Sequence, residues 1–286
     1  MSRSSLFQRT GLLVGPAVLA RLAGTRVILF GVGGVGSWCA EALIRSGVGH
    51  LAIVDSDCVC VTNVNRQIQA LPGRVGRLKV EELGARLREI NPSAEVMAHA
   101  RPYGPDTRDT FAIETYDYVL DAIDSLSPKL GLIEHALLAG RTLFGTMGAS
   151  AKLDPTKVRV ASIWETAGCP LARRIRKRLR RHGITTDFKV VHSEELLLNQ
   201  GPPTDCGTGN CLCPRFATLP DGTAAPAHGW CSRKSYVNGS VVMVTAAFGM
   251  ALASLVVNDV VARVGPAPVR RSVRRAAPAA GRPSRA

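Results

Sequence analysis

Residues 26–47 read RVILFGVGGVGSWCAEALIRSG, which is an apolar run, a glycine-rich turn and a segment with apolar residues at helical spacing. The apolar run predicts a buried strand, and the last segment predicts an amphipathic helix that stops at Gly47. Gly31, Gly33 and Gly36 fit the pattern G-x-G-x-x-G, in which the backbone approaches a phosphate at the N-terminus of the following helix. We therefore expect the fold to begin with a strand, a phosphate-binding turn and a helix.

The alternation of strand and helix patterns continues toward the C-terminus. Apolar runs predict strands at 51–55, 94–100, 116–124 and 141–148, and helical patterns lie among them at 77–90 and 127–140. Strands separated by helices favour a parallel, doubly wound sheet whose ligands bind at the carboxyl ends of the strands. The sequence thus predicts an α/β fold, Rossmann-like, with a mostly parallel sheet.

The pattern changes after about residue 150, where we expect a C-terminal extension. Strands are predicted at 157–163 and 188–193, a basic helix between them at 171–183, and a long Gly-, Pro- and Cys-rich segment at 196–236. Residues 238–265 predict a last helix with an apolar run that approaches the length of a membrane span. Small residues dominate this run and polar residues bound it closely, so we expect a helix buried in the domain or in a dimer interface.

Positive charge gathers in two segments of this 286-residue chain, which has 36 Lys and Arg against 22 Asp and Glu and a net charge of +14. Six arginines lie in the C-terminal tail, whose composition predicts disorder. Seven cations lie in the predicted basic helix: Arg173, Arg174, Arg176, Lys177, Arg178, Arg180 and Arg181. Neither segment contains an acid, so local docking of a polyanion, nucleic acid first, explains the pattern. A solvated helix face is the competing interpretation, although like charges repel along a helix.

Polar residues after the second predicted strand indicate a nucleotide. Asp55 ends that strand and is placed to accept hydrogen bonds from ribose hydroxyls. The glycine turn and Asp55 alone favour a dinucleotide enzyme such as a dehydrogenase. Arg66 past the strand, Lys79 at the start of the next helix and Asp124 at the end of strand 116–124 instead suit a polyphosphate and its Mg²⁺ ion. These residues favour adenylation over hydride transfer.

These motifs together resemble the ubiquitin-activating-enzyme superfamily, which includes bacterial adenylyltransferases of molybdopterin synthase and thiamine biosynthesis. The resemblance rests on GVGGVGSWCAEALIRSGVGHLAIVDSDCVCVTNVNRQIQAL (31–71), VGRLKVEELGARLREINP (75–92) and YDYVLDAIDS (116–125). The stretch MGASAKLDPTKVRVASIWETAGCPLARRIRKRLRRHGI (147–184) is similar to the tRNA threonylcarbamoyladenosine dehydratases, in which a basic helix follows a D-P-T turn. The resemblance covers roughly residues 7–262.

The resemblance implies ATP-dependent activation of a carboxylate, with ATP and Mg²⁺ as cofactors. It assigns the phosphates to the glycine turn, the ribose to Asp55 and the magnesium to Asp124. The candidate nucleotide-binding residues are Gly31, Gly33, Gly34, Gly36, Asp55, Asp57, Asn63, Arg66, Gln67, Lys79 and Asp124. The candidate catalytic residues are Arg9, Arg66, Lys79 and Asp124.

Arg9 resembles the N-terminal arginine that family members insert into the ATP site of the partner subunit. That resemblance implies a homodimer as the catalytic unit, and a solvated N-terminal cation is the alternative. We divide the chain into an N-terminal arm (1–25), an ATP-binding adenylation domain (26–150), a C-terminal substrate-binding part of the same domain (151–265) and a basic tail (266–286).

The resemblance predicts a dehydratase that adenylates the carboxylate of threonylcarbamoyladenosine in tRNA and cyclises it with loss of water. In that reaction the basic helix binds tRNA phosphates. The alternative is an adenylyltransferase that activates the C-terminus of a ubiquitin-like or sulfur-carrier protein. A non-catalytic partner or a dinucleotide-dependent dehydrogenase is disfavoured by Arg66, Lys79 and Asp124.

Eight cysteines are too few for a disulfide scaffold in a chain of this length, so we expect reduced thiols and a cytoplasmic protein. An N-terminal stretch with Arg and Ser but no acid leaves organelle targeting open. Cys206, Cys211, Cys213 and Cys231 form a candidate structural Zn²⁺ site, although their spacing departs from the paired C-x-x-C elements of zinc-bearing relatives. Cys231 also resembles a cysteine that faces the site in some family members, which leaves a thiol role in sulfur transfer and a carrier-protein partner as alternatives.

Overall fold

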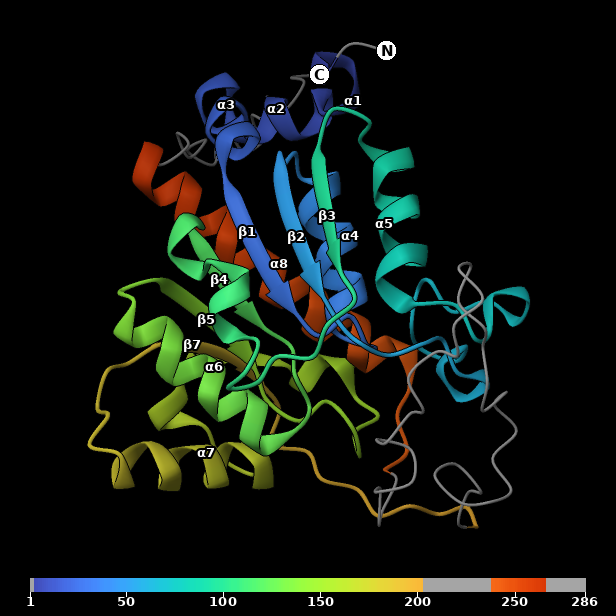
Figure 1. Cartoon of the computed structure of the whole chain (residues 1–286), viewed down its shortest axis with the longest axis vertical. Helices are drawn as coiled ribbons and strands as arrows, with labels where there is room; N and C mark the ends of the chain where they lie inside the picture. Colours follow the sequence, from blue (N-terminus) through green and yellow to red (C-terminus); the bar gives the residue numbers. More distant parts are fainter. Residues whose placement is uncertain (1–2, 203–237, 266–286) are drawn as a thin grey trace, which may run out of the picture.

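The structure, a computed structural model of the chain, describes residues 3–202 and 238–265 (Figure 1). Its centre is one seven-stranded sheet. The strands are β1 (Arg26–Phe30), β2 (His50–Val54), β3 (Glu95–His99), β4 (Tyr118–Asp121), β5 (Thr142–Thr146), β6 (Arg159–Ser162) and β7 (Lys189–His192). Their spatial order is β3-β2-β1-β4-β5-β7-β6, and every pair is parallel except β6 with β7. The predicted α/β fold with a mostly parallel sheet is confirmed.

Helices connect the strands and cover both faces of the sheet. The α-helices are α1 (Arg3–Leu6), α2 (Gln8–Val14), α3 (Pro16–Gly24), α4 (Gly36–Arg45), α5 (Lys79–Ile90), α6 (Leu126–Leu138), α7 (Pro170–Arg181) and α8 (Val242–Val264). The short 3-10 helices are η1 (Val61–Asn63), η2 (Pro72–Arg74), η3 (Arg108–Phe111), η4 (Ile113–Thr115), η5 (Pro155–Lys157) and η6 (Ile163–Glu165). The apolar faces of α3, α4, α5 and α8 form a core on one side of the sheet, and those of α6 and α7 form a second core on the other.

The central strand β1 shows why its sequence is apolar throughout. Val27 and Leu29 lie in the core under α4 and α8, whereas Ile28 and Phe30 lie in the opposite core. All four side chains are fully buried. A parallel strand covered by helices on both faces has no solvent-facing side, so polar residues do not alternate with apolar ones.

The last helix, α8, is long and apolar enough to cross a membrane by length and composition, and half of its most apolar window is buried inside the protein. Phe248, Leu252 and Val256 pack into the first core. At Gly249 a Cβ atom would lie 2.5 Å from the carbonyl oxygen of Val35, so only glycine lets α8 approach the start of α4 this closely. This close packing accounts for α8 as a core helix.

The N-terminal segment is helical and lies at the amino ends of the strands, as Figure 1 shows for α2 and α3. Phe7 and Leu22 are buried, and Gly47, in the turn before β2, lies beside the Phe7 ring. The segment therefore packs against the opposite end of the sheet from the carboxyl ends of the strands.

Strand β4 is shorter than the predicted strand at 116–124, because it ends at Asp121. The Asp121 carboxylate accepts a hydrogen bond from the main-chain N–H of Ile123 at 3.0 Å and thereby turns the chain. Asp124 consequently lies in the connection to α6 and is exposed.

Candidate active site

The glycine turn between β1 and α4 can be built only from glycine at two positions. Gly31 has φ of +87°, and a Cβ atom there would lie 2.8 Å from the carbonyl oxygen of Ala122. A Cβ atom at Gly36 would lie 1.8 Å from the carbonyl oxygen of Gly31. The turn therefore folds tightly against the end of β4, with α4 starting from it at the carboxyl edge of the sheet.

Asp55 follows β2 and connects the glycine turn to the next loop. Its Oδ2 accepts a hydrogen bond from the N–H of Val32 at 2.8 Å, and its Oδ1 accepts one from the N–H of Asp57 at 2.9 Å. Burial raises the pKa of Asp55, and the positive charge of Lys79 opposes that rise. Asp55 thus stands beside the glycine turn, where the sequence predicts a ribose contact.

Lys79 is brought to the site by a short antiparallel pairing between the loop after β2 and the start of α5. The N–H of Val59 donates to the carbonyl oxygen of Arg77 at 2.8 Å, and the N–H of Lys79 donates to that of Asp57 at 3.0 Å. The Lys79 side chain is 7% exposed, and its Nζ lies 2.7 Å from Asp57 Oδ2. Burial alone would lower the pKa of Lys79, but the charges of Asp55 and Asp57 raise it overall. The buried ammonium therefore stays charged.

Arg66 packs directly over the glycine turn. A Cβ atom at Gly34 would lie 3.3 Å from Arg66 Cγ and Cδ, and equally close to Thr245 on α8. The Arg66 guanidinium donates to the carbonyl oxygen of Thr62 at 2.6 Å and to Asn65 Oδ1 at 2.9 Å. Trp38 Nε1 in turn donates to the main-chain oxygen of Arg66 at 3.0 Å. These contacts fix the arginine beside the turn, as the motif predicts.

Two other candidates on this loop face the protein interior. Asn63 is buried, and its Oδ1 accepts a hydrogen bond from the N–H of Cys60 at 3.0 Å, so it shapes the loop. Gln67 is buried beside Gly33. Sequence reasoning missed Gln69, whose Nε2 donates to the carbonyl oxygen of Val32 in the turn at 2.8 Å. Its place within the same NVNRQIQ stretch is the signal that was available.

A buried ion pair lies behind Asp124. Lys129 Nζ lies 2.8 Å from Asp121 Oδ2, and both side chains have no exposure. The same ammonium donates to the carbonyl oxygen of Ile123 at 2.9 Å, so it fixes the turn that carries Asp124. Asp124 itself is exposed, and its charge contributes to the raised pKa of Lys79. Sequence reasoning missed Lys129, for which the signal was one cation in an otherwise apolar helix.

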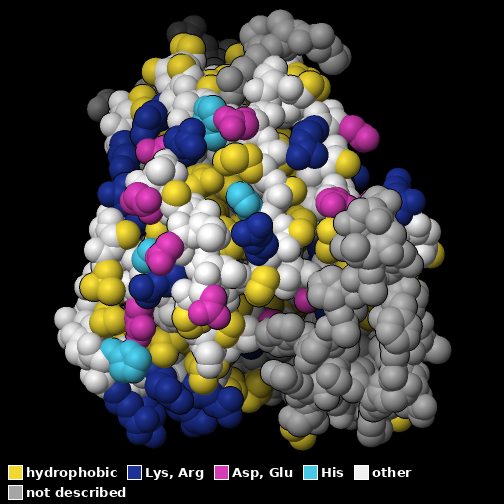
Figure 2. Space-filling model, in the orientation of Figure 1, with side chains coloured by type: hydrophobic (Ala, Val, Ile, Leu, Met, Phe, Trp, Pro, Cys, Tyr) yellow, Lys and Arg dark blue, Asp and Glu magenta, His cyan; other side chains and the backbone are white. Residues whose placement is uncertain are grey.

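The basic helix α7 is confirmed as a helix and presents most of its cations to solvent. Figure 2 shows them as a cluster at the lower edge of the molecule. Ala172, Ile175 and Leu179 bury the opposite face. Arg176 is half-buried and donates to Thr166 Oγ1, so it holds the helix in place. The exposed cations of α7 are Arg173, Arg174, Lys177, Arg178, Arg180 and Arg181.

The remaining candidates lie elsewhere. Arg9 is exposed on α2, at the amino ends of the strands and so away from the glycine turn of its own chain. Cys206, Cys211, Cys213 and Cys231 lie outside the described residues. The expectation of reduced thiols holds for Cys39, Cys58 and Cys169, which are free and buried, and is wrong for Cys60, which is disulfide-bonded.

Comparisons with known proteins agree with this site. Over 264 residues the chain is 35% identical to a tRNA threonylcarbamoyladenosine dehydratase of Escherichia coli (strain K12), with 90% of this chain and 94% of that protein covered. Over 189 residues it is 42% identical to a protein of the same name from Bacillus subtilis (strain 168), with 66% and 74% covered.

Solved structures agree with the fold as well. The E. coli dehydratase in complex with AMP matches at a TM-score of 0.75 and 33% identity, with 91% of this chain and 95% of that chain covered. Its complex with ATP matches at a TM-score of 0.75 and 32% identity, with the same coverage. E. coli MccB with ATP, at a TM-score of 0.57, 15% identity, and coverage of 91% of this chain and 64% of that chain, shares the fold. Because the model of the ThiF family matches residues 7–272, nearly the whole chain, the protein belongs to the ThiF family.

Proposed function

We propose that this chain is an ATP-dependent tRNA threonylcarbamoyladenosine dehydratase. It adenylates the carboxylate of threonylcarbamoyladenosine in tRNA and cyclises the nucleoside with loss of water. One observation carries the proposal: Asp55, Arg66 and Lys79 gather around the glycine turn in a chain that aligns almost end to end with a relative of that name. That relative also has structures with ATP and with AMP.

In the proposed reaction the threonine carboxylate attacks the α-phosphate of ATP, the bond to the β-phosphate breaks, and pyrophosphate leaves. The neighbouring carbamoyl group then attacks the carbonyl of the acyl-adenylate and loses a proton, and AMP leaves with the former carboxylate oxygen. The nucleoside has then lost one water. Because the substrate supplies both nucleophiles, the protein's work is to position groups and to neutralise charge.

The described residues divide this work between them. The glycine turn and the start of α4 receive the phosphates, and Asp55 receives the ribose hydroxyls. Lys79 and Arg66 are the cations beside the turn, and they offset the negative charge that develops on the leaving pyrophosphate.

Asp124 is the described residue that fits a Mg²⁺ ion at this site. In nucleotide sites Mg²⁺ is typically held by one or two carboxylates together with phosphate oxygens and waters. Asp124 is an exposed carboxylate after β4 whose charge acts on Lys79. Within residues 3–202 and 238–265, no group of three or more His, Cys, Asp and Glu is arranged to hold a metal, so the nucleotide would supply most of the ligands. The bound ion would add positive charge beside the pyrophosphate.

The exposed cations of α7 suit the backbone of the tRNA substrate. Six of them are exposed on one helix, and no acid in the helix neutralises them. Phosphate contacts of this kind supply affinity and position a nucleic acid without reading its sequence. A tRNA substrate also agrees with a cytoplasmic location, which we propose.

We further propose a homodimer in which Arg9 serves the ATP site of the partner subunit. Arg9 is exposed on α2, and α2 lies at the amino ends of the strands, whereas the glycine turn lies at their carboxyl ends. Its own site is therefore out of reach, and a second copy is the site that it can serve.

Mass spectrometry of nucleosides tests the function directly. A tRNA that carries linear threonylcarbamoyladenosine is incubated with the purified chain, ATP and Mg²⁺, and its nucleosides are then analysed. We expect the modified nucleoside to lose one water with the wild-type chain and to stay unchanged with Asp124→Ala and Arg66→Ala.

An unchanged nucleoside with the wild-type chain would contradict the proposal. If ATP–pyrophosphate exchange then appears only when a ubiquitin-like or sulfur-carrier protein is added, the substrate is a protein C-terminus. In that case the thiol of Cys231 becomes the next residue to test.

A further inference from the structure

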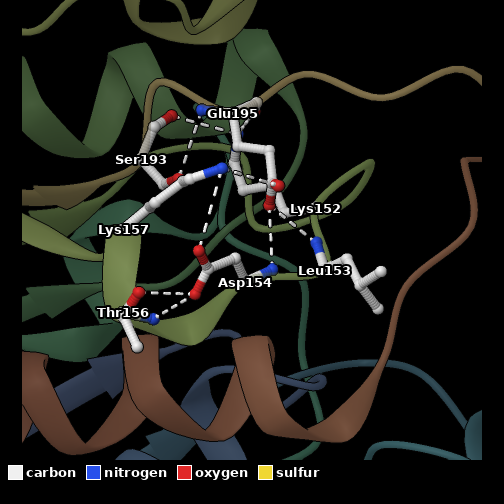
Figure 3. Close-up of polar contacts among 7 residues, drawn as sticks. All are labelled: Lys152, Leu153, Asp154, Thr156, Lys157, Ser193 and Glu195. Atoms are coloured by element: carbon white, nitrogen blue, oxygen red, sulfur yellow. Dashed lines mark hydrogen bonds and ion pairs between the residues drawn. The ribbon is translucent and has the colours of Figure 1, made fainter.

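Lys152 is a buried lysine whose ammonium is held by main-chain carbonyls. The residue is 4% exposed, and its Nζ donates hydrogen bonds to the carbonyl oxygens of Ser193, at 3.0 Å, and Glu195 (Figure 3). Burial lowers the pKa of Lys152. Because removing an ammonium from water costs free energy, lysine is rarely buried like this. The contact therefore requires a gain in the arrangement that it holds.

Glu195 makes the reverse contact. Its Oε2 accepts hydrogen bonds from the main-chain N–H groups of Leu153, at 2.7 Å, and Asp154, at 3.0 Å (Figure 3). These hydrogen bonds hold the pKa of Glu195 below its usual range. Each segment thus places a charged side chain on the main chain of the other. We call Lys152, Leu153, Asp154, Ser193 and Glu195 the clamp.

The clamp joins the segments that follow β5 and β7 at the carboxyl edge of the sheet. The N–H of Met147 donates to the carbonyl oxygen of Val191 at 2.8 Å, so the two segments leave the sheet together. Strand β5 pairs with β4, whose continuation carries Asp124. Residues 147–151 therefore follow next along the edge, on the far side of Asp124 from the glycine turn.

A chain of hydrogen bonds continues from the clamp to the ATP loop. Ala151, beside Lys152, has φ of +59°, and its N–H donates to the carbonyl oxygen of Gly239 at 2.8 Å. The next carbonyl, of Ser240, accepts a hydrogen bond from Asn65 Nδ2 at 2.9 Å. Asn65 Oδ1 in turn accepts one from Arg66 at 2.9 Å. A non-glycine residue in the left-handed region is uncommon and is kept only when its surroundings hold it there.

We propose that Lys152 and Glu195 are positioning residues that hold residues 147–151 as the acyl-side wall of the active site. They act through the main chain and do not touch the substrate. The wall sets the approach of the tRNA carboxylate to the α-phosphate, while the glycine turn sets the place of ATP. This inference rests on the proposed dehydratase function and assigns to that reaction two residues outside the nucleotide site.

The test separates binding from turnover in Lys152→Met and Glu195→Gln. ATP affinity and tRNA affinity are measured at equilibrium, and the single-turnover rate is measured with both substrates saturating. We expect both affinities to stay within about threefold of wild type, while the rate falls by about 100-fold, the loss typical of a misplaced reacting group. The matched controls are Lys157→Met, at an exposed lysine 3.4 Å from the same Glu195 carboxylate, and Glu194→Gln, at the exposed neighbouring acid.

The outcomes separate this inference from the proposed function. A wild-type rate in folded variants, an equal loss in the two control variants, or a loss of ATP affinity as large as the loss of rate each overturns the positioning role. Circular dichroism checks the fold, and if Lys152→Met fails to fold, Glu195→Gln alone decides. A wild-type chain that leaves the nucleoside unchanged overturns the dehydratase proposal and this inference together.

Discussion

Lys79 and Asp57 form an ion pair of 2.7 Å inside the nucleotide site, with the lysine side chain almost fully buried. Asp57 therefore holds the ammonium in place, and Lys79 supplies the charge that ATP meets. We expect Lys79→Met to lower kcat/KM for ATP by about 100-fold or more, as loss of a charge-stabilising donor does in other enzymes.

Asp57→Asn separates the two roles, because it keeps the cation and weakens its anchor. We expect it to change the ATP dissociation constant by less than about tenfold, since the hydrogen bond that it alters is worth about 1.5–3 kcal/mol at most. Equilibrium binding of a fluorescent ATP analogue measures both variants. Equal losses in the two would show that Asp57 itself contacts the nucleotide.

The buried pair of Lys129 and Asp121 predicts a large effect on stability. Lys129→Met leaves the Asp121 carboxylate buried without its counter-charge, which typically costs about 3–5 kcal/mol. The double variant Lys129→Met/Asp121→Leu removes both charges, and we expect it to recover most of the loss. Urea unfolding measures all three free energies of unfolding. A single variant within about 1 kcal/mol of wild type would contradict this account.

Glu41 predicts a dependence of stability on pH. This buried acid on α4 lies 2.7 Å from Arg86 and 2.8 Å from Arg45. Burial alone would raise the pKa of Glu41, but the two arginines outweigh burial and lower it. The stabilisation is therefore present above the unfolded pKa of about 4.3 and is lost as the pH falls through the lower pKa of the folded state.

The variant Glu41→Gln tests this dependence. We expect it to be less stable than wild type by about 2 kcal/mol at pH 7, the usual size of a hydrogen bond to a charged group. The difference should shrink as the pH falls below about 4, because the wild-type carboxylate then becomes protonated. Thermal melts of both proteins between pH 7 and pH 3 measure it. A difference that is constant with pH would mean that packing, not charge, is responsible.

The exposed cations of α7 predict a salt-dependent affinity for tRNA. We expect each phosphate contact that is lost in the variant Arg173→Gln/Arg174→Gln/Lys177→Gln to reduce the slope of log K against log salt by about 0.7–0.9. Arg176→Gln is the matched change within the same helix. Because Arg176 is engaged by Thr166, we expect this variant to lose stability and to keep the slope.

Filter binding between low and moderate KCl concentrations measures the slopes. A triple variant with the wild-type slope would place the tRNA elsewhere on the surface. The ATP affinity of the triple variant serves as the control and should not change.

The local parts of the site could be predicted from the sequence, because single residues carry their own constraints. Gly31 and Gly36 are required by contacts with their immediate surroundings, and the apolar run before them has to be a covered strand. Lys79 could be proposed from its place at the start of a helix, but its pairing with Asp57 depends on a contact between two loops.

Contacts between distant segments could not be predicted in the same way. Lys152 and Glu195 are separated by more than forty residues, and nothing in the sequence around either one shows that it meets the other. The pattern of α7 likewise made Arg176 equivalent to its neighbours, although the helix turns it toward Thr166. Only the packing of the chain separates an arginine that holds the fold from one that is available to a substrate.

The order of the strands separates two tasks along one edge of the sheet. The residues around ATP follow β1, β2 and β4, whereas the clamp follows β5 and β7, and α7 lies between β6 and β7 in the chain. Selection can therefore alter the second group without disturbing the first. A fold arranged in this way is able to keep its means of activating a carboxylate while exchanging the molecule that bears it, so we expect substrate choice to diverge faster than ATP use among its descendants.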